Sequence, residues 1–442
     1  MALRVLERVE RARAYADLAL HAALQRAELT SLDRALATEL VYGTLRWRGR
    51  IDYLLSRVLD REIDRLEPLV AATLRLGAYQ IVFSDRIPAS AAVDQSVRCV
   101  RAAGAERATG LVNAVLRRLR EQHASIRLPG LEEDPLGHLV HALSLPEWIA
   151  RRWLADHGAE EAAALVAALN RVPPRALRAN PLRCTRDELL AELRQRFPAA
   201  APSPLAPRGI LLGPRGDAGR DPAFLSGLCT IQDEASQAVV ALLAPEPGER
   251  VLDTCAAPGA KATAAAEDVG PGGRVVALDR HARRLDLLRR DARRLGLANI
   301  EVRQADATRP LPDSFEAAFD RVLVDAPCSG LGTLRRNPDA RWRLRPEDPA
   351  RLARVQAALL RSAARAVRPG GTLVYSTCTV LREENEEVVR DFLECHPEFR
   401  LPERERLPDA VRPLVGDDGA MRCLPHRHGT DGFYAVRMER VA

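Results

Sequence analysis

The chain has 442 residues, 47% of them hydrophobic, which is enough for about three domains with packed cores. No apolar run approaches the roughly 20 residues that a membrane helix needs, and the first residues are charged where a signal peptide would be apolar, so we expect a cytoplasmic protein that does not contact membranes. The net charge of +6 permits a polyanionic partner but is spread along the chain. Eight cysteines without a CxxC pair match neither a zinc spacing nor a disulfide framework, so reduced thiols are expected.

The N-terminal half predicts a helical bundle followed by a small mixed domain. Residues 1–135 contain few prolines and repeat apolar residues at helical spacing, as between Leu111 and Leu119. Residues 145–230 predict linker helices and then a small α+β subdomain, with a strand at 176–179, a helix at 185–196 and stiff, proline-rich connections.

From about Ile231 to the end, strands and helices alternate. This order predicts a doubly wound, Rossmann-like α/β domain over residues 231–442, in which helices cover a parallel sheet. The expected strands are 251–253, 274–279, 300–304, 319–324 and 371–375, with residues 433–438 as an antiparallel edge strand, and a helix is expected at 383–395. Ligands of such sheets bind beyond the carboxyl ends of the strands, which is where the motifs described next lie.

The segment Asp253-Thr-Cys-Ala-Ala-Pro-Gly-Ala-Lys261 follows the first of these strands and predicts a cofactor loop. Pro258 and Gly259 allow a tight turn, and the helix that follows presents its positive end to a ligand. Lys261 is the only lysine among 66 basic residues, which indicates that a compact charge is needed at this position. The segment lacks the glycine and the Ser/Thr of a phosphate-binding P-loop, and the GxGxxG of dinucleotide folds is absent.

Two acidic residues follow the next strands. Asp279 ends the second strand, 20 residues after Gly259, where a carboxylate can accept hydrogen bonds from both ribose hydroxyls of a nucleotide-like cofactor. Asp306 follows the third strand and is placed to meet an adenine amino group. A solvated carboxylate at a strand end is the alternative for either residue alone, and their joint placement favours the cofactor site.

Two cysteines stand at the same edge of the predicted sheet. Cys328 lies in the run Asp-Ala-Pro-Cys-Ser-Gly at 325–330 and Cys378 in Ser-Thr-Cys-Thr at 376–379, each just after an apolar strand. C5 of a cytosine is a poor nucleophile until a thiolate adds at C6, and a second thiol can then assist release. The pair therefore predicts a methyltransferase that acts on a pyrimidine, whereas Cys255 is expected to serve packing or the close approach of the backbone.

These three motifs in this order, followed by Glu384-Asn-Glu386, resemble the RNA cytosine-5 methyltransferases that use S-adenosylmethionine. The helical start resembles the NusB-like domain that precedes the methylase in 16S ribosomal RNA enzymes of the RsmB/Sun/Fmu type. This second likeness rests on Leu-Val-Tyr-Gly at 40–43, Leu-Arg-Leu-Gly at 74–77 and Val-Asn-Ala-Val-Leu-Arg at 112–117. The resemblance covers nearly the whole chain.

The resemblance implies a role for individual residues. Cys378 would be the nucleophile, Cys328 would help to eliminate the product, and Asp325 would contact the base as well as the cofactor. The cofactor would be S-adenosylmethionine, with no metal. The substrate would be 16S ribosomal RNA, free or in an early small-subunit assembly state, bound with the help of residues 1–135 and 145–230 by a monomer. The residues implied to contact the cofactor are Cys255, Ala256, Ala257, Pro258, Gly259, Ala260, Lys261, Asp279, Asp306 and Asp325.

The chain departs from the Gly-Gly-Lys-Thr run that is usual in this family at Ala260 and Ala262. A methyl group at 260 would restrict the loop conformation. A lost hydroxyl at 262 would weaken a helix-end contact, for which Thr263 is placed to compensate. Both departures bear on cofactor affinity more than on the chemistry.

Two further clusters leave more than one interpretation. Arginines around Trp342 combine phosphate-binding charge with a face on which a base can stack, and a packed tryptophan in a solvated basic loop explains the same pattern equally well. These arginines are Arg335, Arg336, Arg341, Arg343 and Arg345. Cys423, His426 and His428 lack a fourth metal ligand and indicate a structured turn.

Three alternatives to this function stay open. A transfer-RNA or a DNA cytosine methyltransferase would share the motifs, and in the DNA enzymes the cysteine after proline, here Cys328, is the nucleophile. A non-catalytic RNA-binding or antitermination factor would share the NusB-like start.

Overall fold

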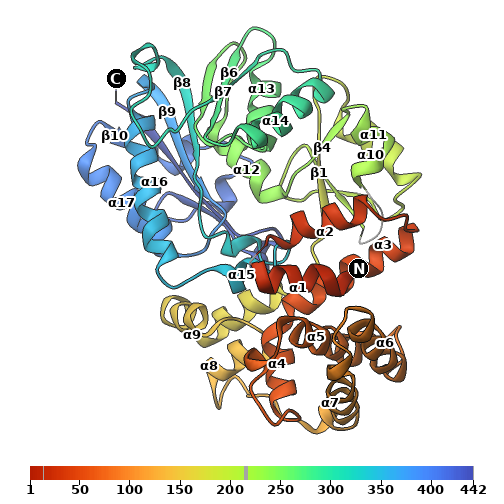
Figure 1. The fold of residues 1–442 in the computed structure, drawn as a ribbon. Coiled ribbons are helices and arrows are strands. Elements are labelled where there is room, and N and C mark those ends of the chain that lie inside the picture. Colours follow the sequence, from red (N-terminus) through yellow and green to blue (C-terminus); the bar gives the residue numbers. More distant parts are fainter. Residues whose placement is uncertain (13, 214–217, 442) are drawn as a thin grey trace. The chain divides into compact units, whose positions relative to one another are not determined.

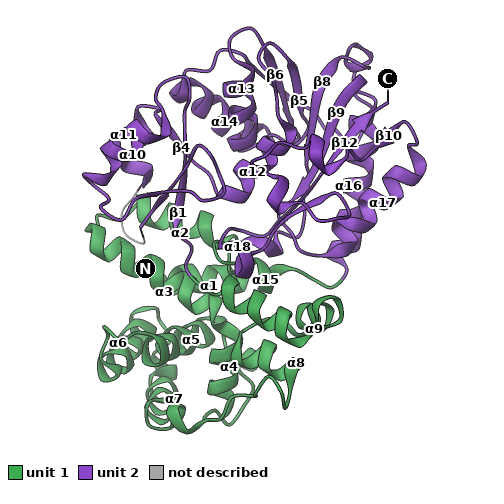
Figure 2. Cartoon of the chain, turned by 180° about the vertical axis from the view of Figure 1, so that it is seen from behind, with its two compact units in different colours: residues 1–171, 334–346 green, residues 172–333, 347–442 purple. Residues whose placement is uncertain are grey.

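The computed structural model describes residues 1–12, 14–213 and 218–441, and it divides into two compact units (Figures 1 and 2). Unit 1 comprises residues 1–171 together with 334–346, and unit 2 comprises residues 172–333 and 347–442. Each unit has its own apolar core. None of the helices in the described part of the chain combines the length and the apolar composition of a membrane-spanning segment.

Unit 1 is all-helical, as the apolar spacing of its sequence predicts. Its core gathers the apolar faces of α4 to α7, and a second cluster joins α1, α2, α3 and α5. The helices are α1 (Ala2–Ala12), α2 (Ala16–Gln25), α3 (Ser31–Arg46), α4 (Arg48–Ser56), α5 (Pro68–Phe83), α6 (Ala89–Ala102), α7 (Thr109–Gln122), α8 (Pro135–Gly137), α9 (Glu147–Leu169) and the short α15 (Ala340–Arg343). The last of these comes from the segment between the two thiol motifs.

Unit 2 begins with the small mixed subdomain that the sequence predicts. Its antiparallel sheet has the order β2-β3-β1-β4, with α10 and α11 beside it. Thr185 caps α10 in a reciprocal capping box with Glu188, which explains why that helix starts where it does. The elements are β1 (Arg175–Ala179), α10 (Arg186–Arg194), β2 (Ala201–Pro202), β3 (Gly209–Leu212), α11 (Pro222–Leu225) and β4 (Cys229–Ile231).

The rest of unit 2 is a Rossmann-like domain around one large sheet of order β10-β12-β9-β8-β5-β6-β7, with β11 also paired to β12. The strands β9, β8, β5, β6 and β7 are parallel, and β12 runs antiparallel to β9. The strands are β5 (Arg250–Asp253), β6 (Arg274–Asp279), β7 (Ile300–Gln304), β8 (Phe319–Asp325), β9 (Val367–Thr377), β10 (Phe399–Arg400), β11 (Ala420–Cys423) and β12 (Phe433–Arg440). The helices are α12 (Glu234–Leu243), α13 (Ala260–Val269), α14 (Ala282–Leu295), α16 (Asp348–Ala364), α17 (Glu386–Cys395) and α18 (Pro425–His428).

Both faces of the sheet are buried at its central strands β5, β6 and β8, which is why these strands are largely apolar, whereas the outer strand β7 is half-buried and carries polar residues. Neighbouring residues of one strand enter opposite cores, as Val251 and Leu252 of β5 do. The chain passes from β7 to β8 across β5, so the strand order reverses between β5 and β8. Ligands of open α/β sheets bind at such a reversal, beyond the carboxyl ends of the strands.

Two expectations for the C-terminal region need correction. The segment 433–438 is antiparallel as expected, but β12 is not an edge strand, because β10 and β11 pair with it. These partners are two and four residues long, too short to show a strand period in the sequence. The sequence also predicts a helix from residue 383, whereas a 3-10 turn, η8 (Arg382–Glu384), precedes α17.

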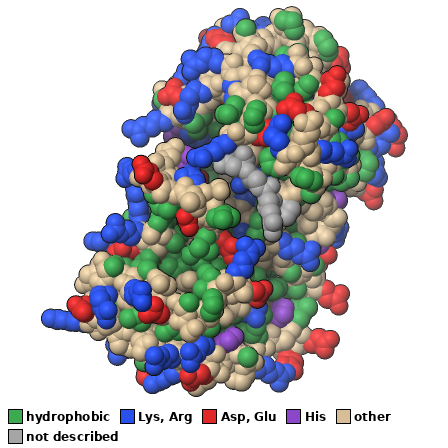
Figure 3. Space-filling model, turned by 90° about the vertical axis from the view of Figure 1, so that its right-hand side faces the viewer, with side chains coloured by type: hydrophobic (Ala, Val, Ile, Leu, Met, Phe, Trp, Pro, Cys, Tyr) green, Lys and Arg blue, Asp and Glu red, His purple; other side chains and the backbone are tan. Residues whose placement is uncertain are grey.

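The charge of the molecule is dispersed. On the face shown in Figure 3, Lys and Arg side chains are interspersed with Asp and Glu rather than gathered in one block. The positive net charge therefore does not by itself mark a binding surface on this face.

Candidate active site

The two predicted catalytic cysteines meet at the carboxyl ends of β8 and β9. These strands are parallel neighbours, and their register pairs Asp325 with Ser376, so the loops that follow them lie side by side. Cys328 Sγ and Cys378 Sγ are 3.4 Å apart, well beyond the roughly 2.05 Å of a disulfide, and both thiols are free and partly buried. The sequence-based prediction that two thiols share one site agrees with this geometry.

The thiol–thiol contact holds the pKa of Cys328 well above its ordinary value. The hydrogen bond to Cys378 is the larger cause, and burial adds to it. Because the thiolate is the nucleophilic form of cysteine, Cys328 is a poor nucleophile at neutral pH and keeps a proton that it can share with Cys378.

A buried dipeptide after the second thiol holds both cysteine loops. Glu384 Oε2 accepts hydrogen bonds from the backbone N–H of Ser329 at 2.9 Å and from Gln356 Nε2 at 3.0 Å, so it fixes the loop that carries Cys328. Burial raises the pKa of Glu384. Its other oxygen, Oε1, has no hydrogen-bond partner among the described residues.

Asn385 does the same for the loop that carries Cys378. Its Nδ2 donates to the carbonyl of Thr379 at 3.1 Å, and its Oδ1 accepts from Thr377 Oγ1 at 2.5 Å. The hydroxyls of Ser329 and Thr379, 2.7 Å apart, connect the two loops directly. Sequence reasoning noted Glu384-Asn-Glu386 as part of a family pattern but gave these residues no role.

Lys261 and Asp325 form an ion pair that connects the cofactor loop to the thiol edge. Lys261 Nζ donates to Asp325 Oδ2 at 2.8 Å and lies 4.9 Å from the centre of the Phe433 ring, and Ser376 Oγ donates to Asp325 Oδ1 at 2.8 Å. The side chain of Lys261 is almost fully buried. The compact ammonium group at the end of a flexible side chain suits this buried ion pair, which is consistent with the single lysine of the chain.

The cofactor loop itself needs a glycine at one position. Gly259 has φ of 123°, and a Cβ there would lie 2.9 Å from Leu288 Cγ, so an L side chain would be both strained and blocked. Ala256 and Ala257 are buried, and Arg284 donates to the carbonyl of Ala257. The turn therefore brings bare backbone to the start of α13, beside Pro258.

Cys255 and Ala262 are packed against the two cores of unit 2 that flank the large sheet. Burial raises the pKa of Cys255 far above its usual range, so its thiol stays protonated. Ala262 is fully buried in the core beneath α13. The hydroxyl of Thr263 donates to the carbonyl of Ala260 at 3.2 Å, and this residue is 1% exposed.

The three carboxylates at the ends of β5, β6 and β7 differ in environment. Asp279 is buried, and its Oδ1 accepts from the backbone N–H of His281 at 2.8 Å. Asp306 is exposed, and the hydroxyl and backbone N–H of Thr308 hold its pKa below the ordinary value. Asp279 is thus presented from the sheet, and Asp306 from a solvent-facing turn.

Asp253 is a residue that sequence reasoning quoted only as the start of a motif. It is 1% exposed, and burial, with the charge of Asp325 as the next cause, raises its pKa to about 8. Its Oδ1 accepts from the backbone N–H of Cys255 at 3.2 Å, while Oδ2 has no hydrogen-bond partner among the described residues. An unpaired acceptor at the strand reversal is suited to a ligand that carries positive charge or N–H donors.

Two residues of the arginine-rich segment around Trp342 make hydrogen bonds within unit 1. These bonds bear on the choice between RNA binding and packing for Arg341 and Trp342. Trp342 Nε1 donates to the carbonyl of Leu45 at 2.6 Å. Arg341 is 0% exposed and donates to the carbonyl of Ser144 at 2.9 Å and to Asn170 Oδ1 at 3.0 Å. Arg341 is therefore not free to bind a nucleic acid, although the sequence pattern allowed it, while Trp342 is half-buried.

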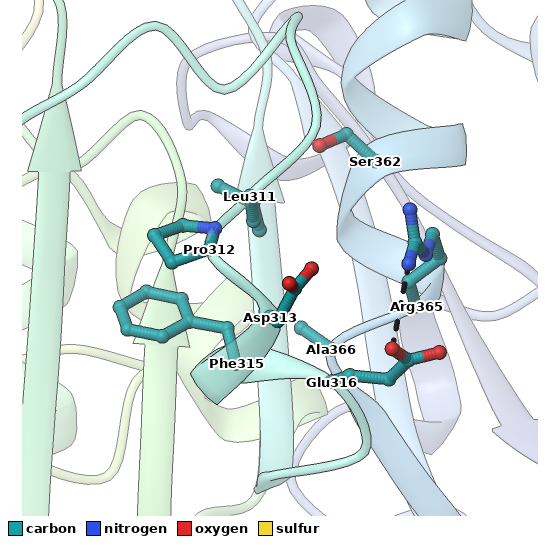
Figure 4. A pocket seen from close by; sticks show the side chains of 8 residues that line it. All are labelled: Leu311, Pro312, Asp313, Phe315, Glu316, Ser362, Arg365 and Ala366. Atoms are coloured by element: carbon teal, nitrogen blue, oxygen red, sulfur yellow. Dashed lines mark hydrogen bonds and ion pairs between the residues drawn. The ribbon is translucent and has the colours of Figure 1, made fainter.

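A small pocket of unit 2 lies away from this site (Figure 4). Phe315, Arg365 and Ala366 are among its lining residues, at the amino ends of β8 and β9, and Arg365 pairs with Glu316 at 3.4 Å. Because the thiols stand at the opposite, carboxyl ends of these strands, this pocket plays no part in the site.

The chain is similar to known proteins over its whole length. The family model described as 16S rRNA methyltransferase RsmB/F matches residues 240–439, that of the NusB family matches residues 1–121, and that of the RsmF/B-like ferredoxin-like domain matches residues 145–217. The probable ribosomal RNA small subunit methyltransferase B of Bacillus subtilis (strain 168) is 39% identical over 100% of this chain and 98% of that protein. A protein of the same description from Synechocystis sp. is 38% identical over 100% and 99%. The crystal structure of PH0851 is 28% identical, with a TM-score of 0.83 over 99% of this chain and 98% of that one.

The fold and the site define a methyltransferase of the Rossmann-like class that uses S-adenosylmethionine. Within that class this chain matches, in order along its sequence, the family models of a NusB-type start, a ferredoxin-like domain and an RsmB/F catalytic domain. The chain belongs to the family of ribosomal RNA small subunit methyltransferase B.

Proposed function

We propose that this protein methylates C5 of a cytosine in 16S ribosomal RNA, through a covalent bond between Cys378 Sγ and C6 of the base. The names of its relatives support ribosomal RNA as the substrate. The observation that carries the chemistry is the pair of free thiols 3.4 Å apart at the strand reversal. We further propose that the protein works in the cytoplasm, as a monomer, on free RNA or an early assembly state of the small subunit.

The reaction begins with the thiolate of Cys378. Its sulfur forms a bond to C6, and the electrons of the C5–C6 double bond move to C5, which becomes the nucleophile. When bound, S-adenosylmethionine supplies a methyl group on a sulfonium for C5 to attack. The target base must leave any stack to reach the thiol.

The second half of the reaction releases the product. The C5 proton passes to a base, the double bond forms again, and the bond between C6 and Cys378 Sγ breaks, which returns the thiolate. Cys328 is the adjacent group for this step, with its sulfur 3.4 Å from Cys378 Sγ, so we assign it to the release of the product. Lys261 and Ser376 hold the carboxylate of Asp325 in a fixed orientation at the carboxyl end of β8.

The residues at the strand ends fit S-adenosylmethionine. Asp253 Oδ2 is an unpaired, buried acceptor suited to a cationic ligand, and Gly259 leaves the backbone bare at the head of α13. Asp279 is suited to the ribose hydroxyls and Asp306 to the adenine amino group. The remaining contacts would come from residues 255–261, with Asp325 at the far side.

The predicted domains divide the work of recognition. We assign RNA binding to the NusB-like residues 1–135 and to the subdomain within 145–230, and methyl transfer to residues 231–442. A non-catalytic RNA-binding factor would not need the ion pair between Lys261 and Asp325 or the clamped thiols, so these contacts favour an enzyme.

A trapping experiment tests the roles of the two thiols. We expect Cys378→Ala to abolish covalent attachment to RNA and Cys328→Ala to let an enzyme–RNA adduct accumulate, seen as a shifted band on a denaturing gel. Cys229→Ala is the control, because that thiol on β4 is buried, and burial raises its pKa to about 12. If Cys328→Ala abolished the adduct and Cys378→Ala accumulated it, the assignment used by DNA enzymes would replace this one.

The substrate is tested separately. Bisulfite sequencing of ribosomal RNA from cells with and without the gene should show one protected cytosine that is lost with the gene. Loss of a protected cytosine in transfer RNA alone would contradict the proposed substrate and leave the chemistry intact.

A further inference from the structure

Arg178, on β1 of the small subdomain, is buried and uses its whole guanidinium group. The residue is 1% exposed. Its Nε donates to Glu267 Oε2 at 3.0 Å and its Nη2 to Glu267 Oε1 at 2.8 Å, which is the two-pronged geometry of a strong arginine–carboxylate pair. Glu267 belongs to α13, the helix that follows the cofactor loop. A strand of the subdomain is thus tied to the cofactor helix.

The other donors of Arg178 go to the first turn of that helix. Its Nη1 donates to the carbonyl of Ala260 at 2.8 Å, and its Nη2 donates to Thr263 Oγ1 at 3.2 Å. Nη1 also contacts Gln232 Oε1. Ala260 immediately precedes Lys261, whose ammonium group holds Asp325 at the thiol edge. The guanidinium therefore fixes the point at which the loop becomes a helix.

A buried ion pair alone would not imply a role in cofactor binding. Such a pair is often replaceable by apolar residues of similar size without loss of stability. Here, however, the bonds to Ala260 and Thr263 are made outside the pair with Glu267, and they end on the cofactor loop and the first helical turn. These are also the positions beside which this chain carries alanine instead of the usual glycine and threonine.

We propose that Arg178 is a positioning residue for the cofactor loop, through which the small subdomain sets the affinity for S-adenosylmethionine. Arg178 reaches the loop only through the carbonyl of Ala260 and the hydroxyl of Thr263, so it orders the loop before the ligand arrives. A preordered loop spends less binding energy on its own ordering. This inference rests on the proposed placement of the cofactor at residues 255–261.

The test replaces the ion pair without leaving a buried charge. In the double variant Arg178→Met/Glu267→Met the pair becomes apolar, so the fold is retained while the bonds to Ala260 and Thr263 are lost. We expect the Kd for S-adenosylmethionine, measured by calorimetry without RNA, to rise by about tenfold or more, the effect of losing one or two charge-assisted hydrogen bonds. The KM for the cofactor should rise with it, while kcat at saturating cofactor stays within about twofold.

Arg208→Met is the matched control. Arg208 also contacts Glu267, at 3.5 Å, and Asp268, but it makes no recorded contact with Ala260 or Thr263, so its loss should leave the Kd unchanged. Arg178→Lys provides a second measurement if the double variant is unstable, because lysine keeps the charge opposite Glu267 and lacks the planar fork. An unchanged Kd in a folded variant of Arg178 would reduce this residue to a purely structural role. Because the readout is cofactor binding without RNA, it does not depend on which base atom is methylated.

Discussion

Asp253 has a pKa that its position in the sequence does not lead one to expect. A carboxylate at the end of an apolar strand is usually solvated, and here it lies behind the cofactor loop with one oxygen unpaired among the described residues. Since its pKa is about 8 in the folded protein and near 4 in an unfolded chain, the folded state binds more protons between these values. Stability should therefore fall as the pH rises through this window.

We predict that Asp253→Asn removes this pH dependence. Between pH 6 and pH 9 the free energy of unfolding of the wild type should lose at most about 1.4 kcal/mol per pH unit through this group, and that of the variant should be flatter. Chemical denaturation at several pH values measures both. Asp306→Asn is the control, since its pKa is lowered and its titration lies below this window. Parallel pH profiles for wild type and Asp253→Asn would contradict the buried titration.

At the scale of elements, the ends of the strands could be predicted from the sequence. The contacts by which Glu384 and Asn385 hold the two cysteine loops could not. The apolar runs before Cys328, Cys378 and Asp279 locate three strand ends, because buried parallel strands are continuous in hydrophobicity. Glu384 and Asn385 carry no such pattern. Their role depends on η8 folding back beneath two loops, which is a tertiary contact that local spacing does not encode.

We predict that Asn385→Ala slows formation of the enzyme–RNA adduct by about tenfold or more, because the loop of Cys378 loses two hydrogen bonds and with them its orientation. The Kd for S-adenosylmethionine should stay within about twofold. Asn299→Ala is the matched control, since that amide also donates two hydrogen bonds, to the carbonyls of Ala266 and Gly270, away from the thiols. Equal rates of adduct formation in both variants would refute the proposed role of Asn385 in orienting the loop of Cys378.

At the scale of the whole molecule, the sequence predicts three successive domains, and the contacts divide the chain into two units that are not continuous in sequence. Residues 334–346 lie between the thiol motifs, so their arginines and Trp342 pointed equally to RNA binding and to packing. Packing depends on partners such as Leu45 and Ser144, almost 300 and 200 residues away in sequence. No spacing rule could have identified these partners.

We predict that a fragment of residues 1–171 is destabilised and that a synthetic peptide of residues 334–346 restores it. The peptide should raise the melting temperature in a concentration-dependent way, because a ligand that binds only the folded state stabilises it by mass action. The same peptide with Arg341→Met and Trp342→Ala lacks the buried hydrogen bonds and should have no effect. Equal melting curves with both peptides would show that the segment is dispensable for unit 1.

The grouping of residues 334–346 with residues 1–171 also affects when unit 1 is completed during synthesis. A ribosome releases residues 1–171 early, but the thirteen residues that complete unit 1 emerge only after some 160 more have been added, a delay of about ten to thirty seconds at typical elongation rates. During that interval residues 1–171 are present without Arg341 and Trp342, which donate hydrogen bonds to Ser144 and Leu45 in the completed unit. Residues 334–346 follow β8 and Cys328 in the chain, so unit 1 is completed only after more than half of unit 2 has been synthesised.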